Sequence, residues 1–401
     1  MTLISQRLDL IKPSPTLAVS QKAAELKKQG IDVISMGAGE PDFDTPENIK
    51  LAAISAIKRG ETKYTNVNGT LELRTAIVKK FKNENDLDYK PDEIIVSNGG
   101  KQVIYNLFMA SLNPSDEVII PAPYWVSYPD IVTLSGGVPI FVECQIEDGF
   151  KLTPDKLRKA ISAKTKWLII NSPSNPSGSA YTKQELLSLA SVLEEFPHVN
   201  VMTDDIYEHI IFDDFKFFTL ASVAPQLKSR IFIVGGVSKT YSMTGWRIGY
   251  GAGNKDLVNA MSVIQSQTTS NASSISQAAS IEALSGDQSF IIPNRNGFQE
   301  KRDLAFEILS STRGLECYKP EGAFYLFPRC EGLIGKKTHS GEVIANDTDL
   351  ASYLVNAGRV AVVPGSAFGL AGYFRISYAM NIDELKEGCL RIKEFCEKLH
   401  D

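Results

Sequence analysis

Between residues 94 and 252 the sequence repeats one pattern, a short and nearly continuous apolar run followed by a segment compatible with a helix. Strands that are apolar on both faces and alternate with helices indicate a mostly parallel sheet that helices cover on both sides. We therefore predict an α/β domain here. The apolar runs are Glu93–Val96, Val118–Ile120, Trp167–Ile170, Val199–Met202, Ile231–Val234 and Ile248–Ala252, and the helical segments include 101–112, 153–163 and 183–196.

The flanking regions predict a second, smaller unit. Ser14 as N-cap, Pro15 at the first helical position and Gly30 as a stop bound one predicted helix, 15–29. Because 401 residues suggest two domains, we expect a large domain over 47–290 and a smaller α+β domain made of 1–46 and 291–401. Further predicted elements are helices over 47–59, 253–284, 296–311 and 382–399, strands over 315–328 and 359–379, and a polar insertion around 331–347.

Charge and composition favour a small molecule as the partner of this chain. The net charge of −5 gives no electrostatic reason to expect nucleic acid or an anionic membrane. No stretch approaches the roughly 18 apolar residues of a membrane span, and charges interrupt the N-terminal residues where a signal peptide would be apolar. Five scattered cysteines and four histidines without i, i+4 pairing favour a reducing compartment and no metal site. We expect a cytoplasmic protein.

Lys239 is the only charged residue between Ile231 and Trp246. Most lysines are solvated surface charges, but this one follows a predicted buried strand and has apolar and aromatic neighbours. Desolvation lowers the pKa of an ammonium and makes lysine a nucleophilic amine that can form a Schiff base. Arg247 follows eight residues later and suits a phosphate, although a structural ion pair is an equal alternative. Together with Ser238, these residues match a cofactor that carries an aldehyde and a phosphate.

Ligands of open α/β sheets lie beyond the carboxyl ends of the strands, so the residues that follow each run are candidates. Gly100 and Lys101 open a helix whose N–H groups can hold a phosphate, and Trp125 can stack on a planar ring. Asp204 can pair with a protonated pyridine nitrogen, which would lower the pKa of its carboxyl group, and Tyr207 can donate to a phenolic oxygen. The alternatives are a common glycine turn for Gly100 and Lys101, core packing for Trp125, and a cap of the next element for Asp204.

With these residues assembled, the chain resembles the class I aminotransferases of fold type I, in the branch of bacterial aspartate aminotransferases. The resemblance extends over essentially the whole chain, and ten motifs in the family's order make it specific. The motifs are GAGEPDFDTP (37–46), KYTNVNG (63–69), SNGGKQ (97–102), PAPYWVSYP (121–129), NSPSNPSG (171–178), TDDIYEH (203–209), SKTYSMTGWRIGY (238–250), PEGAFYLF (320–327), VVPGSAFG (362–369) and FRISYA (374–379).

The resemblance implies a mostly parallel seven-stranded sheet, pyridoxal 5′-phosphate as cofactor, and a homodimer. Lys239 would link to the cofactor and then move the proton of the substrate. Asp204 would pair with the ring nitrogen, Asn175 and Tyr207 would bond the ring oxygen, and Trp125 would stack on the ring. The groups implied to hold the phosphate are the amides of Gly100 and Lys101, the side chains of Ser238 and Arg247, and Tyr64 of the neighbouring subunit.

Arg375 is supported by its own strand as well as by the resemblance. In FRISYA the apolar Phe374, Ile376 and Tyr378 share one face, and Arg375 shares the other with small residues. That arrangement leaves room for a bidentate carboxylate, although an exposed strand arginine is the alternative that the hexapeptide alone favours. The implied substrate-binding set is Gly39, Trp125, Asn175, Arg375 and Lys12.

The implied reaction passes the amino group of aspartate to 2-oxoglutarate in two half-reactions, with prephenate as a further acceptor. Lys101 and the segment from Lys12 to Thr16 are candidates for contacting the distal part of the substrate. The motif IKPSPT resembles the arm of bifunctional aspartate/prephenate aminotransferases, in which the lysine that matches Lys12 matters for prephenate. The alternatives are an aromatic aminotransferase, a carbon–sulfur β-lyase of the same fold and, remotely, a cofactor-binding transcription regulator.

Overall fold

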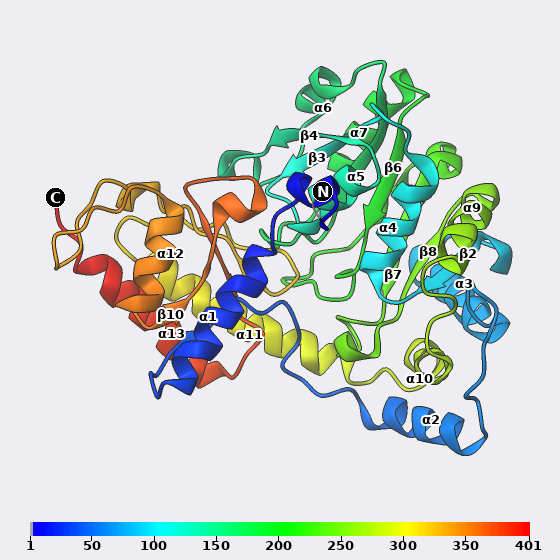
Figure 1. Ribbon diagram of the computed structural model, residues 1–401, viewed down its shortest axis with the longest axis horizontal. Coiled ribbons are helices and arrows are strands. Elements are labelled where there is room, and N and C mark those ends of the chain that lie inside the picture. Colours follow the sequence, from blue (N-terminus) through cyan, green and yellow to red (C-terminus); the bar gives the residue numbers. More distant parts are fainter. Residues whose placement is uncertain (1–2) are drawn as a thin grey trace.

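The fold is built around one large sheet, seen in a computed structural model that describes residues 3–401. In chain order its strands are β2 (Ile94–Ser97), β3 (Glu117–Ala122), β4 (Val138–Glu143), β5 (Thr165–Asn171), β6 (Asn200–Asp204), β7 (Ile231–Gly236) and β8 (Gly249–Ala252). They lie in the order β2-β8-β7-β6-β5-β3-β4 (Figure 1). Every neighbouring pair is parallel except the two that involve β8. The predicted mostly parallel seven-stranded sheet is therefore confirmed.

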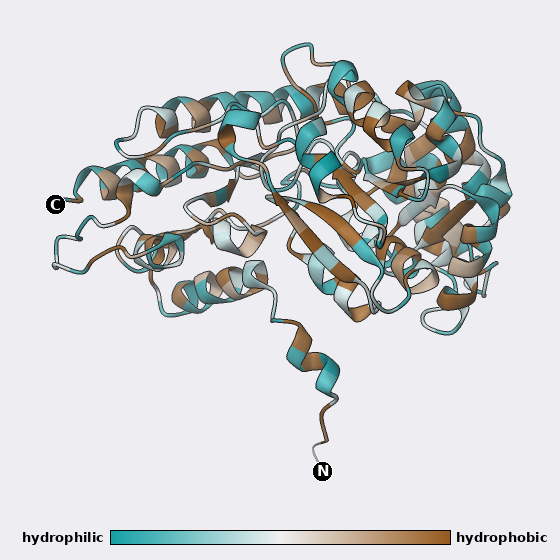
Figure 2. Ribbon diagram, turned by 90° about the horizontal axis from the view of Figure 1, so that it is seen from above, coloured by the Kyte–Doolittle hydropathy of each residue, from teal (hydrophilic) through white to brown (hydrophobic). Residues whose placement is uncertain are grey.

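Alternate residues of each central strand enter two different hydrophobic cores. In β5, Leu168 and Ile170 pack into one core, while Trp167 and Ile169 pack into the core on the opposite face. This is why the strands lack the alternating polar positions of a half-exposed sheet, and Figure 2 shows them as brown bands between helices with mixed faces. The helices of this part are α2 (Glu47–Lys58), α3 (Leu71–Asn85), α4 (Gly100–Ser111), α5 (Ser127–Leu134), α6 (Pro154–Ala160), α7 (Lys183–Glu195), α8 (Leu220–Val223), α9 (Lys255–Ser266) and α10 (Ser274–Ser285).

A third core lies in the smaller lobe, on the left of Figure 1. The elements of this lobe are α1 (Pro15–Lys28), α11 (Ile291–Ser310), α12 (Asp347–Asn356) and α13 (Ile382–Glu397), with β1 (Ile34–Ser35), β9 (Tyr325–Leu326), β10 (Val360–Ala361), β11 (Val363–Pro364) and β12 (Phe374–Ser377). Short 3-10 helices are η1 (Gln6–Leu10), η2 (Pro91–Glu93), η3 (Ile146–Asp148), η4 (Pro225–Arg230), η5 (Thr244–Trp246), η6 (Glu331–Leu333) and η7 (Gly365–Phe368).

Three expectations about elements were wrong. The segment 253–284 is not one helix, because α9 ends at Ser266 and Ser270 adopts a left-handed conformation with φ of 58° before α10 begins. The strand predicted over 315–328 is reduced to β9, which has two residues. The region 359–379 contains three short strands separated by η7 and a turn instead of longer strands. The smaller lobe is therefore stabilised mainly by side-chain packing around its helices, because its strands are short and pair over few residues.

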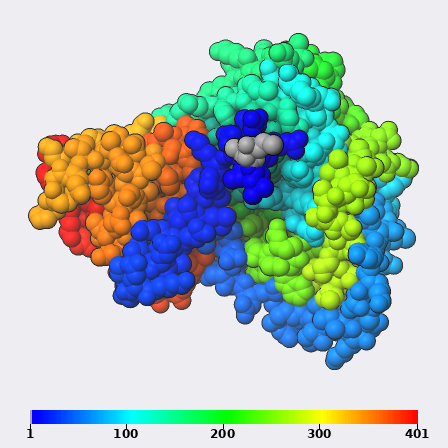
Figure 3. All heavy atoms as spheres, in the orientation of Figure 1, coloured from blue at the N-terminus to red at the C-terminus, as the bar shows by residue number. Residues whose placement is uncertain are grey.

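The N-terminal residues form an arm that leaves the body of the molecule. Residues 3–10 are exposed throughout, and Figure 2 shows them projecting away from the two lobes. Seen from the front in Figure 3, the arm lies over the large lobe beside its junction with the smaller lobe, where η1 approaches α5. Among the residues that the structure describes, no helix combines the length and apolarity needed to cross a membrane.

Candidate active site

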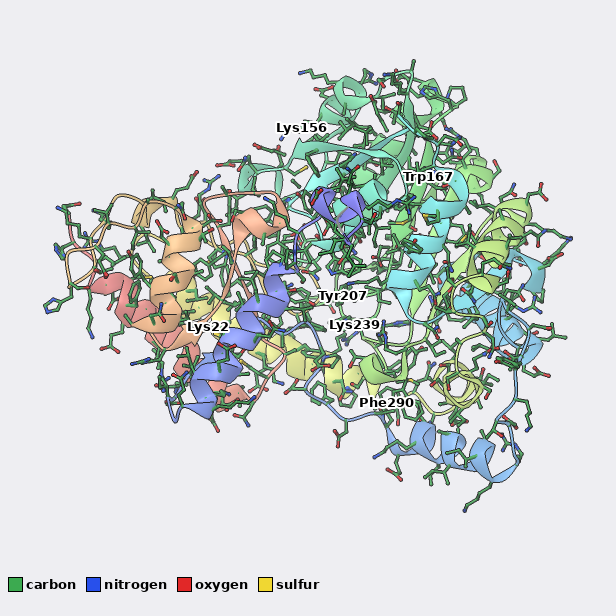
Figure 4. All side chains as sticks on the ribbon, in the orientation of Figure 1. Lys22, Lys156, Trp167, Tyr207, Lys239 and Phe290 are labelled. Atoms are coloured by element: carbon green, nitrogen blue, oxygen red, sulfur yellow. The ribbon has the colours of Figure 1, made fainter. Side chains whose placement is uncertain are left out.

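One cavity of about 410 Å³ lies at the carboxyl ends of the sheet strands, where the two lobes meet. Figure 4 shows Tyr207 and Lys239 next to each other at this junction. Most of the predicted site residues line this one space, so side chains that are far apart in the sequence meet here. Those that line it are Gly39, Gly100, Lys101, Trp125, Asn175, Asp204, Tyr207, Ser238, Lys239, Arg247 and Arg375.

Lys239 enters the cavity from the connection between β7 and β8. Its Nζ donates to the carbonyl oxygen of Gly39 at 2.5 Å and lies 5.9 Å from the ring centre of Tyr207. Burial lowers the pKa of Lys239 to about 8, and the nearby positive charges of Arg375 and Arg247 act in the same direction. The prediction that this lysine is desolvated is confirmed, and a substantial fraction of the amine is neutral near physiological pH.

Asp204 ends β6 and is buried at the floor of the cavity. Its Oδ2 accepts a hydrogen bond of 2.6 Å from Tyr128, and its Oδ1 accepts from the N–H of Ile206 at 3.4 Å. Burial raises the pKa of Asp204 to about 6, although both hydrogen bonds oppose the rise. Desolvation therefore outweighs the effect of the protein's own groups. The lowering expected from a protonated ring nitrogen depends on the bound ring and stays a prediction. A cationic partner would stabilise such a carboxylate strongly.

Arg375 is fully embedded rather than exposed, so the alternative of a surface arginine is wrong. Its guanidinium lies between two rings, 4.6 Å from the centre of Tyr325 and 4.9 Å from the centre of Phe368. It donates to Asn175 Oδ1 at 2.8 Å and to the carbonyl of Gly37 at 2.6 Å. Its Nε is buried without a protein partner. A buried cation with an unpaired donor on a cavity wall suits a carboxylate ligand.

Asn175 gains a defined orientation from that contact. Because a guanidinium only donates, the amide oxygen of Asn175 faces Arg375, and its amide nitrogen is the end that remains free to donate. The backbone N–H of Asn175 also donates to Asn171 Oδ1 at 2.8 Å, which fixes the turn after β5. Asn175 thus connects the carboxylate-binding end of the cavity to its centre.

Glycines let the backbone approach Arg247 at the other end of the cavity. Gly99 has φ of 88°, and a Cβ on it would lie 2.1 Å from Nη2 of Arg247. A Cβ on Gly249 would lie 2.2 Å from the amide nitrogen of Gly100, the first residue of α4. The first N–H groups of a helix have no acceptor within it, so this end offers backbone donors beside a guanidinium. The arrangement fits an anionic group.

Trp125 and Lys101 form part of the wall between these ends. The Nζ of Lys101 lies 5.0 Å from the ring centre of Trp125, and the ring of Trp125 meets Tyr128 edge to face at 5.3 Å. Desolvation and the neighbouring Arg247 charge lower the pKa of Lys101. The aromatic wall and the cation beside it could contact a planar ring and a second acidic group.

Two predicted residues do not line the cavity. Lys12 is exposed in the segment before α1, whereas Thr16 and Ser20 of α1 reach the cavity wall. Tyr64 is 90% exposed and lines a separate hollow of about 620 Å³ beside α2 and α10. The role predicted for Tyr64 requires a second subunit, and it stays a prediction.

The sequence and structure were compared with known proteins. The model of the family described as aminotransferase class I and II matches residues 31–392. The chain belongs to this family. It is 65% identical over 99% of its length to a probable aspartate/prephenate aminotransferase of Rickettsia felis, of which 97% is covered. It is 54% identical to an aspartate/prephenate aminotransferase of Cereibacter sphaeroides, with complete coverage of both chains. The crystal structure of an aspartate aminotransferase from Rhizobium meliloti matches with a TM-score of 0.97, 52% identity and complete coverage of both chains.

Sequence reasoning missed several residues of this aminotransferase that face the cavity. Tyr128 and Tyr325 lie inside quoted motifs, PAPYWVSYP and PEGAFYLF, but received no role because their hydroxyl partners come from distant segments. Glu40 also lines the cavity, and its Oε2 accepts from Thr244 Oγ1 at 2.9 Å. The motif positions were the available signal, whereas the partners could only come from the fold.

One acidic cluster outside the cavity is an ion-pair network in this aminotransferase. Glu84, Glu208 and His209 lie within 4.8 Å of one another. The ammonium of Lys80 bonds Glu208 and lies 3.5 Å from Glu84, so a cation of the protein already occupies the centre of the cluster.

The residues present fit pyridoxal phosphate. A partly neutral amine, a buried carboxylate that lacks a cation, and a glycine-lined anion site share one cavity. An aldehyde, a protonatable ring nitrogen and a phosphate are the complementary groups.

Proposed function

We propose that this enzyme uses pyridoxal 5′-phosphate to transfer the amino group of L-aspartate to 2-oxoglutarate, giving oxaloacetate and L-glutamate, and that it also aminates prephenate to arogenate. The observation that carries the proposal is the single cavity that joins Lys239, Asp204 and Arg375. The names of the Rickettsia felis and Cereibacter sphaeroides relatives support both acceptors, and the Rhizobium meliloti structure supports aspartate.

The cofactor, when bound, supplies an electron sink for the pair left on the substrate when its α-proton departs. Lys239 would hold the aldehyde end, and Asp204 would keep the ring nitrogen protonated. The oriented amide of Asn175 and the hydroxyl of Tyr207 would donate to the ring oxygen, and Trp125 would cover the ring face. The residues that would hold the phosphate are Gly100, Lys101, Ser238 and Arg247, with Tyr64 of the partner subunit.

Arg375 would fix the substrate carboxylate, because its guanidinium plane is held between two rings and its Nε is unpaired. Gly39 would close over the bound amino acid. The Lys239 amine would serve as the acid and base that moves the proton of the substrate α-carbon to the cofactor side. Its lowered pKa suits this task, since the neutral base is present near neutral pH.

Three experiments on one preparation test the proposal. The holoenzyme is assayed with aspartate plus 2-oxoglutarate, with aspartate plus prephenate, and with an aromatic amino acid as donor. We expect the first two to react fastest. Lys239→Ala should abolish turnover and the visible absorbance of the attached cofactor, because Lys239 is the amine that is proposed to attach it. Release of pyruvate and ammonia, or preference for aromatic donors, would overturn the assignment in favour of a β-lyase or an aromatic aminotransferase.

Lys12 offers a test of the second acceptor. Lys12→Ala should lower kcat/KM for prephenate about ten- to a hundredfold, the size of a lost charge-assisted hydrogen bond, and change kcat/KM for aspartate less than about twofold. Lys22→Ala is the matched control, because Lys22 is exposed on α1 and Figure 4 shows it away from Lys239. Equal losses for both substrates would refute the role of Lys12.

We also propose the domain division 47–290 and 1–46 with 291–401, and a homodimer. The division is supported by the third hydrophobic core, which unites β1 with the elements from α11 onward. A homodimer is supported by the exposed apolar residues of α2, Leu51, Ile54 and Ile57, and by the exposed Tyr64 nearby. Each proposed site therefore combines the cavity residues of one subunit with Tyr64 of the partner subunit.

A further inference from the structure

Tyr325 lies between the two ends of the cavity without a role in the function proposed above. It stands on β9, where it pairs with Ser377 of the antiparallel strand β12. Arg375 is two residues from Ser377 on the same strand, so Tyr325 and Arg375 are diagonal neighbours on one face of the sheet. Diagonal neighbours are within reach of aromatic and long side chains. The strand register therefore brings this ring to the guanidinium.

The ring of Tyr325 forms one side of the pocket that holds Arg375. Its centre is 4.6 Å from the guanidinium carbon, and the ring centre of Phe368 is 4.9 Å from the same carbon. Tyr325, Phe368 and Arg375 are all buried. A cation held between two desolvated ring faces is attracted to both, and its plane can no longer turn freely. The ring of Tyr325 thus sets the direction in which Arg375 presents its donors.

The hydroxyl of Tyr325 contacts Tyr207, which is proposed to bond the ring oxygen of the cofactor. Its oxygen lies 2.8 Å from the hydroxyl oxygen of Tyr207. A Cβ on Gly39 would lie 3.0 Å from the same hydroxyl, so the backbone of that residue closes over it. Each hydroxyl has one proton, and only one of the two can donate across this contact. If Tyr325 donates, the proton of Tyr207 stays available for another acceptor. If Tyr207 donates, its proton is used in this contact.

The charges around the pair favour donation from Tyr325 to Tyr207. Burial raises the pKa of both hydroxyls and the Arg375 cation opposes the rise at both, whereas the Asp204 carboxylate adds to the rise at Tyr207 and is not among the causes at Tyr325. The more acidic hydroxyl is the better donor. Arg375 lies against Tyr325 directly, whereas Lys239 lies 5.9 Å from the ring of Tyr207.

We propose that Tyr325 is a positioning residue that serves both ends of the site: its ring fixes the plane of Arg375 for the substrate carboxylate, and its hydroxyl donates to Tyr207 so that Tyr207 donates to the ring oxygen of the cofactor. This inference rests on the proposed function. It assigns separate tasks to the ring and to the hydroxyl of one side chain, and the two tasks can be removed separately.

Tyr325→Phe removes the hydroxyl and keeps the ring. The readout is the pH midpoint of the visible absorbance of the resting holoenzyme, which reports protonation of the nitrogen that joins Lys239 to the cofactor. Without the donor from residue 325, Tyr207 is a weaker donor, the ring oxygen holds more negative charge, and the nearby nitrogen keeps its proton to higher pH. We expect the midpoint to rise by roughly 0.2–0.6 pH unit and KM for aspartate to change less than about twofold.

Tyr325→Leu removes the ring as well, and we expect KM for aspartate to rise about tenfold in addition to the shift in midpoint. Tyr378→Phe is the matched control, since the hydroxyl of this buried tyrosine donates to the carbonyl of Ala323 at 3.3 Å and the residue does not line the cavity. It should leave both readouts unchanged.

An unchanged or lowered midpoint in Tyr325→Phe, or a shift of equal size in Tyr378→Phe, would overturn the inference. A large rise in KM for aspartate in Tyr325→Phe, which lacks only the hydroxyl, would overturn it as well. These outcomes do not require Tyr325→Leu to fold. They are also distinct from failure of the proposed function, which would appear as a wild-type protein that lacks transamination or the visible absorbance.

Discussion

The pKa values of two ionisable side chains in the cavity are shifted in opposite directions, and each shift favours the neutral form of its group. Burial lowers the pKa of Lys239 to about 8 and raises that of Asp204 to about 6, because removal from water disfavours both charges. Perturbed groups of this kind cluster at functional sites. The sequence alone could indicate Lys239, since it is the only charge in an apolar window. It could not indicate Tyr128 or Tyr325, because their hydroxyl contacts depend on segments brought together by the fold.

The shifted pKa of Lys239 predicts how cofactor attachment depends on pH. Only the neutral amine attacks an aldehyde, and its fraction increases about tenfold per pH unit below the pKa. When the cofactor-free protein is mixed with pyridoxal phosphate, we expect the observed attachment rate constant to rise with pH and to level off above about 8. Rapid-mixing absorbance measures it. A midpoint near the ordinary lysine value of 10.5 would contradict the desolvation seen here.

Asp204→Asn should separate stability from activity. At neutral pH the buried carboxylate is ionised although its folded pKa of about 6 lies above the ordinary 3.8, so its charge costs stability at every pH above about 4. The neutral amide removes that cost, and we expect the cofactor-free variant to gain of the order of 2 kcal/mol in the free energy of unfolding. Turnover should fall by about two to three orders of magnitude, because the electrostatic partner of the ring nitrogen is lost. Denaturant unfolding and steady-state kinetics measure the two effects, and lower stability with unchanged turnover would oppose this account.

At the scale of elements, the central strands and the edge strand β2 were predictable, and the other edge strand, β4, was not. Strands such as β5 and β7 are buried on both faces, and each contains a continuous apolar run, Trp167–Ile170 and Ile231–Val234. The edge strand β4 has only exposed and half-buried residues, and Pro139 interrupts its apolar residues. Helix α3 was also not predicted, because polar residues dominate it and its apolar positions are few. Packing, which a single sequence does not display, determines such elements.

A substitution at Gly99, the residue before α4, tests the proposed phosphate site. In Gly99→Ala the new Cβ would meet the guanidinium of Arg247, so the guanidinium must move away from the helix start. We expect the dissociation constant for pyridoxal phosphate to rise about tenfold or more, as for the loss of one charge-assisted hydrogen bond. Gly136→Ala is the control, because Gly136 has a similar φ of 85° but open space around its Cβ. Equal weakening in both variants would assign the effect to backbone strain alone.

At the scale of the whole molecule, the exposed arm and the exposed apolar residues of α2 set this chain apart from a self-contained monomer. Isolated surface hydrophobics are common, but Leu51, Ile54 and Ile57 share one helix face near Tyr64. Together with the distance of Tyr64 from the cavity in its own chain, this arrangement favours sites completed across a two-fold axis.

Mixed dimers test whether Tyr64 acts across the interface. Lys239→Ala and Tyr64→Ala each impair the enzyme, but a dimer with one subunit of each type contains one site that lacks both changes. If equal amounts are dissociated and reassociated together, about half of the dimers are mixed, and about a quarter of wild-type activity should return. Each variant treated alone is the control. No recovery, with mixed dimers present by native mass spectrometry, would mean that Tyr64 serves its own subunit or neither.

Strand β8 runs antiparallel to both of its neighbours, and this direction keeps two residues of the proposed site close together in the sequence. Since β7 delivers the chain to the cavity side of the sheet and β8 returns from it, the proposed cofactor anchors Lys239 and Arg247 belong to one short excursion. A parallel neighbour would have forced the chain to cross behind the sheet between them. Their spacing is therefore a property of about a dozen consecutive residues, and a graft or circular permutation that keeps this excursion intact carries both anchors with it.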